Sequence, residues 1–348
     1  MTSSRAALAT ALLLSATLLS ACAASPAEPD PTPSGSPSAT PTPDPAGAPH
    51  VRIDATCDDL VPADRIVELF GAPEPVSSSA VPATLYQASL VQEGVLECRW
   101  GSDSRAGVAV VPDAADGFPS PDALAGDDTV SVEFDAFGNA SRHYCVGAWC
   151  VADVLVGSAW LYVWVWHEPD AAAARAWLEA ATAHAVDVVS SSRILPRDWE
   201  PARSSPLTLE ALDSPVYAAT VAEAFGLTEP QPYGGDEFAA WSLWTRGNTG
   251  YSRLVWSEFA DSSRRVGIET LPGGAWAAEA LATRPGASPV DVPGAESGSI
   301  AEEAGRRTVC FVALGASLCV DSEGDAATLL AQTGAFVGML QEEFATPG

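Results

Sequence analysis

The spacing of apolar residues predicts a long amphipathic helix near the end of each half of the chain. Mostly apolar residues three or four positions apart share one face of both segments. In the first half these residues are Ala174, Trp177, Leu178, Ala181, Ala185, Val188 and Val189, and in the second half they are Leu329, Leu330, Thr333, Phe336, Val337 and Leu340. Such a stripe is typical of a helix that covers a core. Its presence in both halves suggests a duplicated domain.

The chain aligns with itself when it is shifted by about 155 residues, which indicates an internal repeat. Residues 57–71 match residues 212–226 without a gap, and both segments read as helices that end at a glycine. In the second copy Ser214 is a favourable helix cap and Pro215 is a favourable first helical residue. The two copies are therefore expected to begin with the same element.

The match continues into the strands that follow. With a shift of 156 residues, 85–100 aligns with 241–256, and with a shift of 160 residues Cys150 falls on Cys310. Gly, Asn and Asp turns, such as the one at 248–250, separate the short strands.

The order of these elements predicts the fold class. Each copy reads as helix, hairpin strands, short helix, strands and helix, which is typical of an α+β domain in which helices cover an antiparallel sheet. We expect two tandem domains of this kind, at residues 51–197 and 205–346, joined by a linker at 198–204. Each is close to the commonest domain size.

An aromatic strand is the strongest local feature of the sequence. Alternate residues of a strand share a face, so the segment 160–166 would have one aromatic and one aliphatic side. The aromatic side consists of Trp160, Tyr162, Trp164 and Trp166. The first interpretation is a central strand packed by helices on one face and by the other repeat on the opposite face. The second is a platform on which these four residues bind a sugar, peptide or other apolar ligand.

The beginning of the chain predicts an export signal. Arg5 is the only charged residue before an apolar run at 6–19, which has the length of a signal-peptide core and is short for a membrane-spanning helix. The Leu-Ser-Ala-Cys sequence at 19–22 resembles the lipobox of bacterial lipoproteins. That resemblance implies removal of residues 1–21 and attachment of acyl chains such as palmitate to Cys22. The protein would then be anchored to the cell membrane on its extracytoplasmic face.

Residues 22–50 are expected to form a disordered linker. They contain nine prolines among small and acidic residues and almost nothing apolar. Such a segment cannot bury enough surface to offset the entropy cost of folding. We expect a stalk that lifts the folded part away from the membrane.

The charged residues exclude several classes of function. All 17 basic residues are arginine, and 45 acidic residues give a net charge of −28. Nucleic acid is not expected as a partner, because phosphate binding depends on clustered lysine and arginine. The absence of lysine excludes lysine Schiff-base and pyridoxal-phosphate chemistry, and we expect no cofactor.

Six of the seven cysteines remain once Cys22 is set aside. An even number of cysteines in an oxidising compartment is typical of disulfides. Spacing and elimination predict the pairs Cys145–Cys150, Cys310–Cys319 and Cys57–Cys98.

The repeat supports the third pair independently. Cys57 aligns with Leu212 and Cys98 aligns with Leu254. A covalent pair in the first copy thus corresponds to an apolar pair in the second, as expected for a buried contact between the first helix and a strand.

The same cysteines belong to a wider pattern. Cys57, a helix that ends at Gly71, and the sequence Cys-Arg-Trp at 98–100 span about 45 residues. This arrangement resembles actinobacterial cell-envelope lipoprotein domains of unknown function, which carry a Cys…Leu-Gly…Cys-x-Trp signature. Here Phe70 stands in place of the leucine, and the second copy lacks both cysteines. The resemblance implies an envelope location and the type of fold, and it carries over no catalytic residues.

No metal-binding or catalytic motif emerges. His143, Cys145, Cys150 and His167 are residue types that bind zinc, but their spacing fits no zinc motif and exported cysteines oxidise, so we expect no metal site. His184 lies on the apolar face of its predicted helix, and we expect it to be a hydrogen-bonded core residue. The chain has neither a Gly-x-Ser-x-Gly nor a Ser-x-x-Lys sequence.

We therefore expect an extracytoplasmic lipoprotein without enzymatic activity. It would bind a small molecule, a glycan or an envelope protein, at the interface of its two domains or on the aromatic strand. The alternatives are a structural or accessory subunit of an envelope complex and a hydrolase that acts on wall polymers. A binding module should have a concave pocket, an accessory subunit a flat apolar patch, and an enzyme a pair of perturbed carboxylates in a cleft.

Overall fold

The computed structural model describes most of the chain beyond the predicted linker. The described residues are 48–101, 105–119, 133–134, 136–137, 140–167, 170–200, 205–232, 240–259, 261–303 and 305–344. The predicted signal peptide 1–21, Cys22, nearly all of the linker 22–50 and residues 201–204 of the second linker lie outside them.

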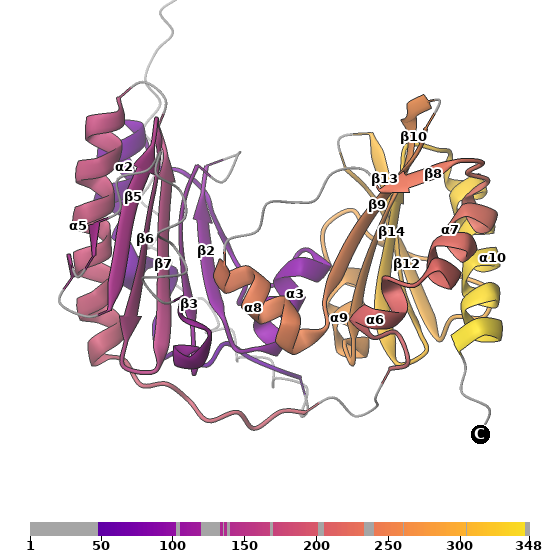
Figure 1. Ribbon diagram of the computed structural model, residues 1–348, viewed down its shortest axis with the longest axis horizontal. Coiled ribbons are helices and arrows are strands. Elements are labelled where there is room, and N and C mark those ends of the chain that lie inside the picture. The colour runs from indigo at the N-terminus through magenta and orange to yellow at the C-terminus, as the bar shows by residue number, and fades with distance from the viewer. Residues whose placement is uncertain are drawn as a thin grey trace, which may run out of the picture. The chain divides into compact units, whose positions relative to one another are not determined.

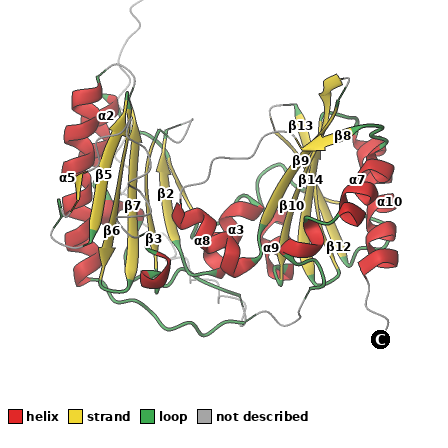
Figure 2. Ribbon diagram, viewed as in Figure 1, coloured by secondary structure: helices red, strands yellow, loops and turns green. Residues whose placement is uncertain are grey.

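The first repeat contains a seven-stranded antiparallel sheet with helices on both faces (Figures 1 and 2). Its helices are α1 (Cys57–Leu60), α2 (Ala63–Phe70), α3 (Leu85–Gln92), the 3-10 helix η1 (Ala115–Gly117) and α5 (Ala171–Ser191). Its strands are β1 (Val76–Ser78), β2 (Leu96–Trp100), β3 (Ala106–Val111), β4 (Glu133–Phe134), β5 (Ser141–Val146), β6 (Trp149–Val156) and β7 (Ala159–Trp166). The strand order is β1-β2-β3-β7-β6-β5-β4.

The second repeat is built in the same way. Its helices are α6 (Leu209–Leu212), α7 (Pro215–Phe225), α8 (Ala240–Thr249), α9 (Ala275–Ala282) and α10 (Ala326–Phe344). Its strands are β8 (Pro230–Pro232), β9 (Ser252–Glu258), β10 (Asp261–Pro272), β11 (Ser288–Pro289), β12 (Ser297–Glu303), β13 (Arg306–Ala313) and β14 (Ala316–Ser322). Read from β8, the strand order is β8-β9-β10-β14-β13-β12-β11, which matches the first sheet read from β1. The predicted α+β class, with two antiparallel sheets each covered by helices, is confirmed.

The helix ends follow the capping residues in the sequence. The Thr56 hydroxyl accepts a hydrogen bond from the Asp59 backbone amide, and the Asp59 carboxylate accepts one from the Thr56 backbone amide in return. The Thr56 hydroxyl also donates to the Asp59 carboxylate at 2.7 Å, and this bond, together with the one from the Thr56 backbone amide, holds the pKa of Asp59 below its usual value. Ser214 caps α7 as predicted, and Pro215 is its first residue. Helices α2 and α7 both end at a glycine in the left-handed region, where a side chain would be strained.

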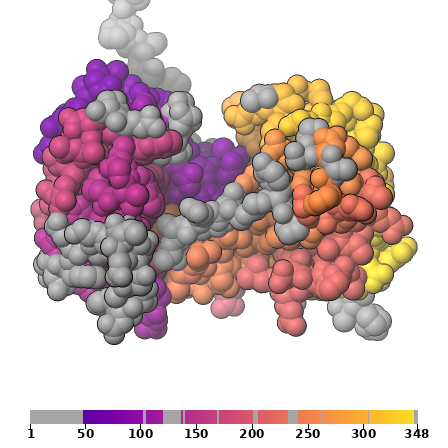
Figure 3. Space-filling model, turned by 45° about the horizontal axis from the view of Figure 1, so that its top comes forward, coloured from indigo at the N-terminus to yellow at the C-terminus, as the bar shows by residue number. Residues whose placement is uncertain are grey.

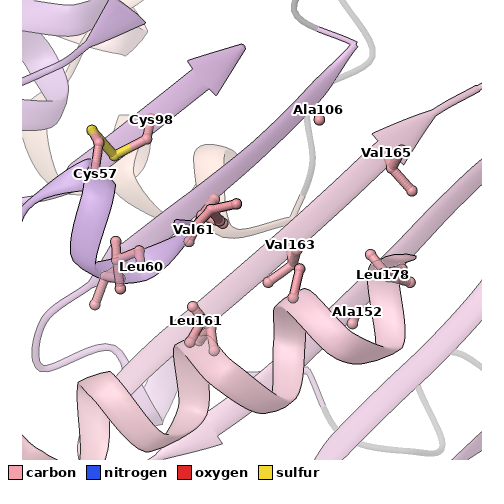
Figure 4. Close-up of a cluster of buried hydrophobic side chains, with 14 of the residues drawn as sticks. Cys57, Leu60, Val61, Cys98, Ala106, Ala152, Leu161, Val163, Val165 and Leu178 are labelled. Carbon is pink, nitrogen blue, oxygen red and sulfur yellow. A yellow bond between two sulfur atoms is a disulfide. The ribbon is translucent and has the colours of Figure 1, made fainter. Parts of the chain in front are cut away.

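One face of each sheet is covered by the long helix at the end of its repeat. Trp177, Leu178 and Ala181 of α5 pack on the aliphatic side of β7, which contributes Leu161 and Val163 (Figure 4). In the second repeat α10 covers the equivalent face of the second sheet. Both amphipathic helices predicted from the sequence are therefore confirmed, and each stabilises one of the two cores.

All three predicted disulfides are present. Cys57–Cys98 joins α1 to β2 within the first core (Figure 4). Cys145–Cys150 joins β5 to β6, and Cys310–Cys319 joins β13 to β14. The apolar counterparts of the first pair, Leu212 and Leu254, belong to one hydrophobic cluster in the second repeat, as the alignment predicted.

Two short helices, α3 and α8, were not predicted. The turn predicted at 248–250 is wrong for its first two residues, which end α8; only Gly250 follows the helix. Seven of the eight residues of α3 are buried. A helix buried on nearly all sides has no polar stripe, so the periodicity that reveals an amphipathic helix is missing.

The two repeats belong to one compact unit, and each contributes its short helix to the other (Figure 1). Leu85 and Ala88 of α3 pack with Leu271 and the Cys310–Cys319 pair of the second sheet. Conversely, the Trp241 ring of α8 lies 5.8 Å from the Tyr162 ring of the first sheet. The space-filling view shows violet residues of the first repeat beside orange residues of the second (Figure 3). Each of the two helices thus lies between the sheets and packs against the sheet of the other repeat, and we call α3 and α8 the exchanged helices.

Polar contacts accompany this exchange. The Gln92 side-chain amide donates to the Pro272 carbonyl at 3.2 Å. The Arg284 guanidinium donates to the Ala83 carbonyl at 2.9 Å. The rings of Tyr86 and Tyr251 meet edge to face with centroids 5.9 Å apart. The two sheets therefore share one packed layer rather than a solvated boundary.

Candidate functional site

The aromatic row of β7 is covered along most of its length. Trp160 and Tyr162 are buried and Trp164 is half-buried, while Trp166 is 46% exposed. Trp241 of α8 packs on Tyr162. This is the arrangement of the first interpretation, in which the other repeat covers the aromatic side. The space over Trp160 and Tyr162 is filled by protein, and ligand binding by the four aromatic residues stays a prediction.

The same face of the second sheet is lined by different residues. The hairpin turns fix the correspondence, because Val156 pairs with Ala159 before one turn and Ala313 pairs with Ala316 before the other. Three pairs back from each turn, the Asp153–Tyr162 pair of the first repeat corresponds to Cys310–Cys319 in the second.

The difference between the repeats is larger two residue pairs further from each hairpin turn. Val151 and Trp164 face each other in the first repeat, and Thr308 and Asp321 do so in the second. Large aromatic side chains in the first sheet are thus replaced by a disulfide and a carboxylate in the second. Smaller side chains leave space that packed aromatic rings would fill.

This correspondence corrects the alignment made from the sequence. A shift of 160 residues placed Cys150 on Cys310, whereas the turns require a shift of 157, which places Asp153 on Cys310. Cys150 packs in the cluster beneath α5, and Cys310 packs against α3 on the opposite side of its sheet. A slip by an odd number of residues moves every side chain to the other face.

A pocket of about 370 Å³ occupies this face of the second sheet. Its floor is the disulfide Cys310–Cys319 with neighbouring residues of β9, β10, β12, β13 and β14, and part of its wall is the start of α3 from the first repeat. The remaining lining residues are Thr84, Leu85, Arg253, Glu269, Arg284, Ala301, Glu303, Arg306, Thr308 and Asp321. The pocket is therefore complete only when both repeats are present.

Two ion pairs lie within the pocket. Arg306 pairs with Asp321, whose side chain is only 16% exposed. The Arg253 Nε lies 3.4 Å from the Glu269 Oε1. A Cβ added at Gly267 would collide with the Asp321 carboxylate, just as one at Gly107 would collide with the Trp164 ring of the first sheet. In each repeat a glycine makes room for the side chain on the neighbouring strand.

The chemistry of this pocket is that of a binding site for a charged small molecule. Guanidinium groups form paired hydrogen bonds with carboxylates and phosphates, and carboxylates accept hydrogen bonds from ammonium groups. The cysteines of the floor are joined in a disulfide, so neither is a thiol nucleophile. A covalent cross-link between two strands also holds the floor in one geometry.

The equivalent face of the first repeat buries its charges. Glu97 is almost fully buried, and Arg99 donates to its carboxylate at 2.7 Å. Burial raises the pKa of the Glu97 carboxyl, and the Arg99 charge opposes that rise. Asp153 is buried with Arg142, and burial raises the pKa of Asp153 in the same way. These groups are enclosed among protein side chains.

The histidine and zinc candidates lie elsewhere. His184 is exposed rather than in the core, and its Nε2 lies 2.9 Å from the Asp59 carbonyl at the rim of an open depression, so the expected core position is wrong. Cys145 and Cys150 are bonded to each other and are therefore not thiolate ligands. Within the described ranges, no group of three or more His, Cys, Asp or Glu side chains is arranged to hold a metal ion.

The pocket residues were not identified as a site in the sequence. Arg253, Arg284 and Arg306 lie far apart along the chain and follow no motif. The available signal was the pair of hairpin turns, because counting back from them aligns Trp164 with Asp321 and exposes the change in chemistry. The contribution of α3 to the wall had no sequence signal, since it comes from the other repeat.

No protein-family model, curated protein or solved structure matches this chain. Among the helices that the structure describes, none combines the length and apolar character needed to cross a membrane. The structure alone thus defines the class of protein: an α+β protein with two similar repeats, exchanged helices, disulfides and a charged pocket in its second repeat.

Proposed function

We propose that this chain is a lipid-anchored extracytoplasmic protein that binds a small polar ligand in the pocket of its second repeat. One observation carries the proposal: the second sheet has an open pocket of about 370 Å³ where the first sheet has packed aromatic rings. That volume lies within the usual range for small-molecule sites. The first repeat would serve as the scaffold and the second as the binding part.

Two features support a binding protein outside the cytoplasm. The Leu-Ser-Ala-Cys sequence at 19–22 is the expected site of lipid attachment. Three disulfides in the described part of the chain fit an oxidising compartment. A concave, charged pocket favours binding over the flat apolar patch expected of an accessory subunit.

Filling the pocket is expected to abolish ligand binding. An Asp321→Trp substitution would place an indole over Gly267, as Trp164 lies over Gly107 in the first repeat. The full-length protein would be incubated with a small-molecule extract of cells, separated by size exclusion and analysed by mass spectrometry. We expect the unsubstituted protein to retain a compound whose bound amount falls about tenfold or more in the variant, a loss of at least ~1.4 kcal/mol in binding.

Matched variants separate binding from folding. Thr308→Phe narrows the pocket and leaves both ion pairs intact, so it should also lose the compound. Asp187→Trp makes the same chemical change as the first variant on the exposed surface of α5 and should retain it. If the unsubstituted protein retains nothing, or if the pocket variants retain as much as the control, the proposed binding function is wrong.

Membrane attachment has a separate test. With serine at position 22 there is no sulfur for lipid attachment, so Cys22→Ser protein should leave the membrane fraction almost completely. Ser25→Ala, a change just after the 19–22 sequence, should stay in that fraction. Cell fractionation with immunodetection gives the distribution. A Cys22→Ser protein that remains with the membrane would argue against the anchor while leaving the pocket proposal unaffected.

A further inference from the structure

The charges that line the pocket are balanced in number but not all paired. The guanidiniums of Arg253, Arg284 and Arg306 face the carboxylates of Glu269, Glu303 and Asp321. Arg253 and Arg306 each pair with a carboxylate of the pocket, Glu269 and Asp321 respectively. Neither Arg284 nor Glu303 forms an ion pair with any residue that the structure describes. One positive and one negative group are therefore left to meet a ligand.

Arg284 is positioned to receive an anionic group. It follows α9, is half-buried, and is held by its hydrogen bond to the Ala83 carbonyl just before α3. A guanidinium has five N–H donors, and that carbonyl accepts from only one nitrogen, so further donors remain for a ligand. A fixed guanidinium edge matches the two oxygens of a carboxylate.

Glu303 supplies the opposite charge. It is exposed near the end of β12 and lies across from Arg306 in the strand register. Because Arg306 is engaged by Asp321, the Glu303 carboxylate is available to an ammonium group. The pocket lining also contains Ala301 and Thr308, whose small side chains leave room for a short backbone.

We infer, on the basis of the proposed binding function, that the pocket takes a net-neutral zwitterion: a free amino acid or short peptide. Its carboxylate would bind Arg284 and its ammonium group would bind Glu303. The net charge of −28 opposes the approach of a free anion over long distances, whereas a zwitterion has no net charge to be repelled. Lining groups of both signs then recognise its two ends.

Blocked peptides test the two ends separately. The full-length protein would be titrated with mixtures of free L-amino acids and of L-alanyl dipeptides, and with the same dipeptides as N-acetyl and as C-terminal amide derivatives. Binding would be measured by native mass spectrometry and by the shift in thermal unfolding. We expect at least one free compound to bind, with an affinity roughly tenfold or more above that of either blocked form.

Two variants assign each end of the ligand to its residue. Arg284→Gln should no longer distinguish a free dipeptide from its amide, because the carboxylate has lost its partner. Glu303→Gln should no longer distinguish a free dipeptide from its N-acetyl form. Arg175→Gln, on the exposed surface of α5, should retain both preferences. A purely structural role of either pocket residue would weaken binding of all forms equally.

The outcomes separate this inference from the proposed function. If no free compound binds, or if a blocked form binds as well as the free one, the zwitterion assignment is wrong. If the protein nevertheless retains another small molecule from the cell extract, and Asp321→Trp abolishes that binding, the binding function stands with a different ligand. If it retains nothing at all, both proposals fail.

Discussion

Removing the Cys57–Cys98 disulfide by a double substitution to alanine is expected to lower the free energy of unfolding by about 4 kcal/mol. The bond joins residues 41 positions apart, so it restricts a long loop in the unfolded chain. Both cysteines are buried in the first core, where α1 meets β2. Urea denaturation of the two proteins, with the slope fitted separately for each because the cross-link also makes the unfolded chain more compact, would measure the loss.

The hairpin disulfide provides a matched control. Cys145 and Cys150 are separated by only five positions, and the loop argument gives about 2 kcal/mol for their bond. The two double-alanine variants therefore differ mainly in the length of chain that is constrained. Equal losses in both, or no loss in the Cys57–Cys98 variant, would contradict the role assigned to the long-range bond.

Features that depend on local sequence or on the repeat were predictable. The capping residue Ser214 and the terminal glycines Gly71 and Gly226 mark helix ends. The Ser214 side chain accepts a hydrogen bond from a backbone amide in the first turn of its helix, and each glycine ends its helix in the left-handed conformation. The pairing of Cys57 with Cys98 followed from the leucines at the equivalent positions of the second copy. The helix ends depend only on residues close in sequence, and the disulfide was predicted by comparing the two copies, so neither prediction needs the tertiary structure.

The exchanged helix α3 was not predictable from periodicity. Leu85 and Ala88 of α3 face the second sheet while Leu90 joins the cluster on the first, so apolar residues occur around the whole helix. In a sequence, a helix is recognised by the contrast between the apolar residues of its buried face and the polar residues of its solvated face. A helix between two sheets lacks that contrast, and only the tertiary packing reveals it.

The pocket was missed for a related reason. Matching Cys150 with Cys310 anchored the strand alignment three residues away from the register set by the hairpin turns. That odd difference hid the replacement of Trp164 by Asp321, the clearest chemical difference between the repeats. Part of the wall also comes from Leu85 in the other repeat, and no local pattern reports a contact over that sequence distance.

Because α8 packs against the first sheet, replacing Trp241 with alanine should destabilise that sheet, although the residue belongs to the second repeat. Its side chain is only 2% exposed and packs with Tyr162, Trp160 and Val151. Truncating a buried tryptophan to alanine typically costs about 3–5 kcal/mol, because the cavity that remains cannot fully collapse. Hydrogen exchange should therefore accelerate at the β3 and β7 amides as well as in the second repeat.

Leu243 offers a control within the same helix. It is 54% exposed, and Leu243→Ala preserves helix propensity, so we expect a change within about 0.5 kcal/mol. With Trp241→Ala, a single urea transition at lower denaturant would mean that the repeats unfold together, as the shared layer between the sheets requires. Faster exchange confined to the second sheet, with β3 and β7 unaffected, would instead mean that the exchanged helices do not couple the repeats.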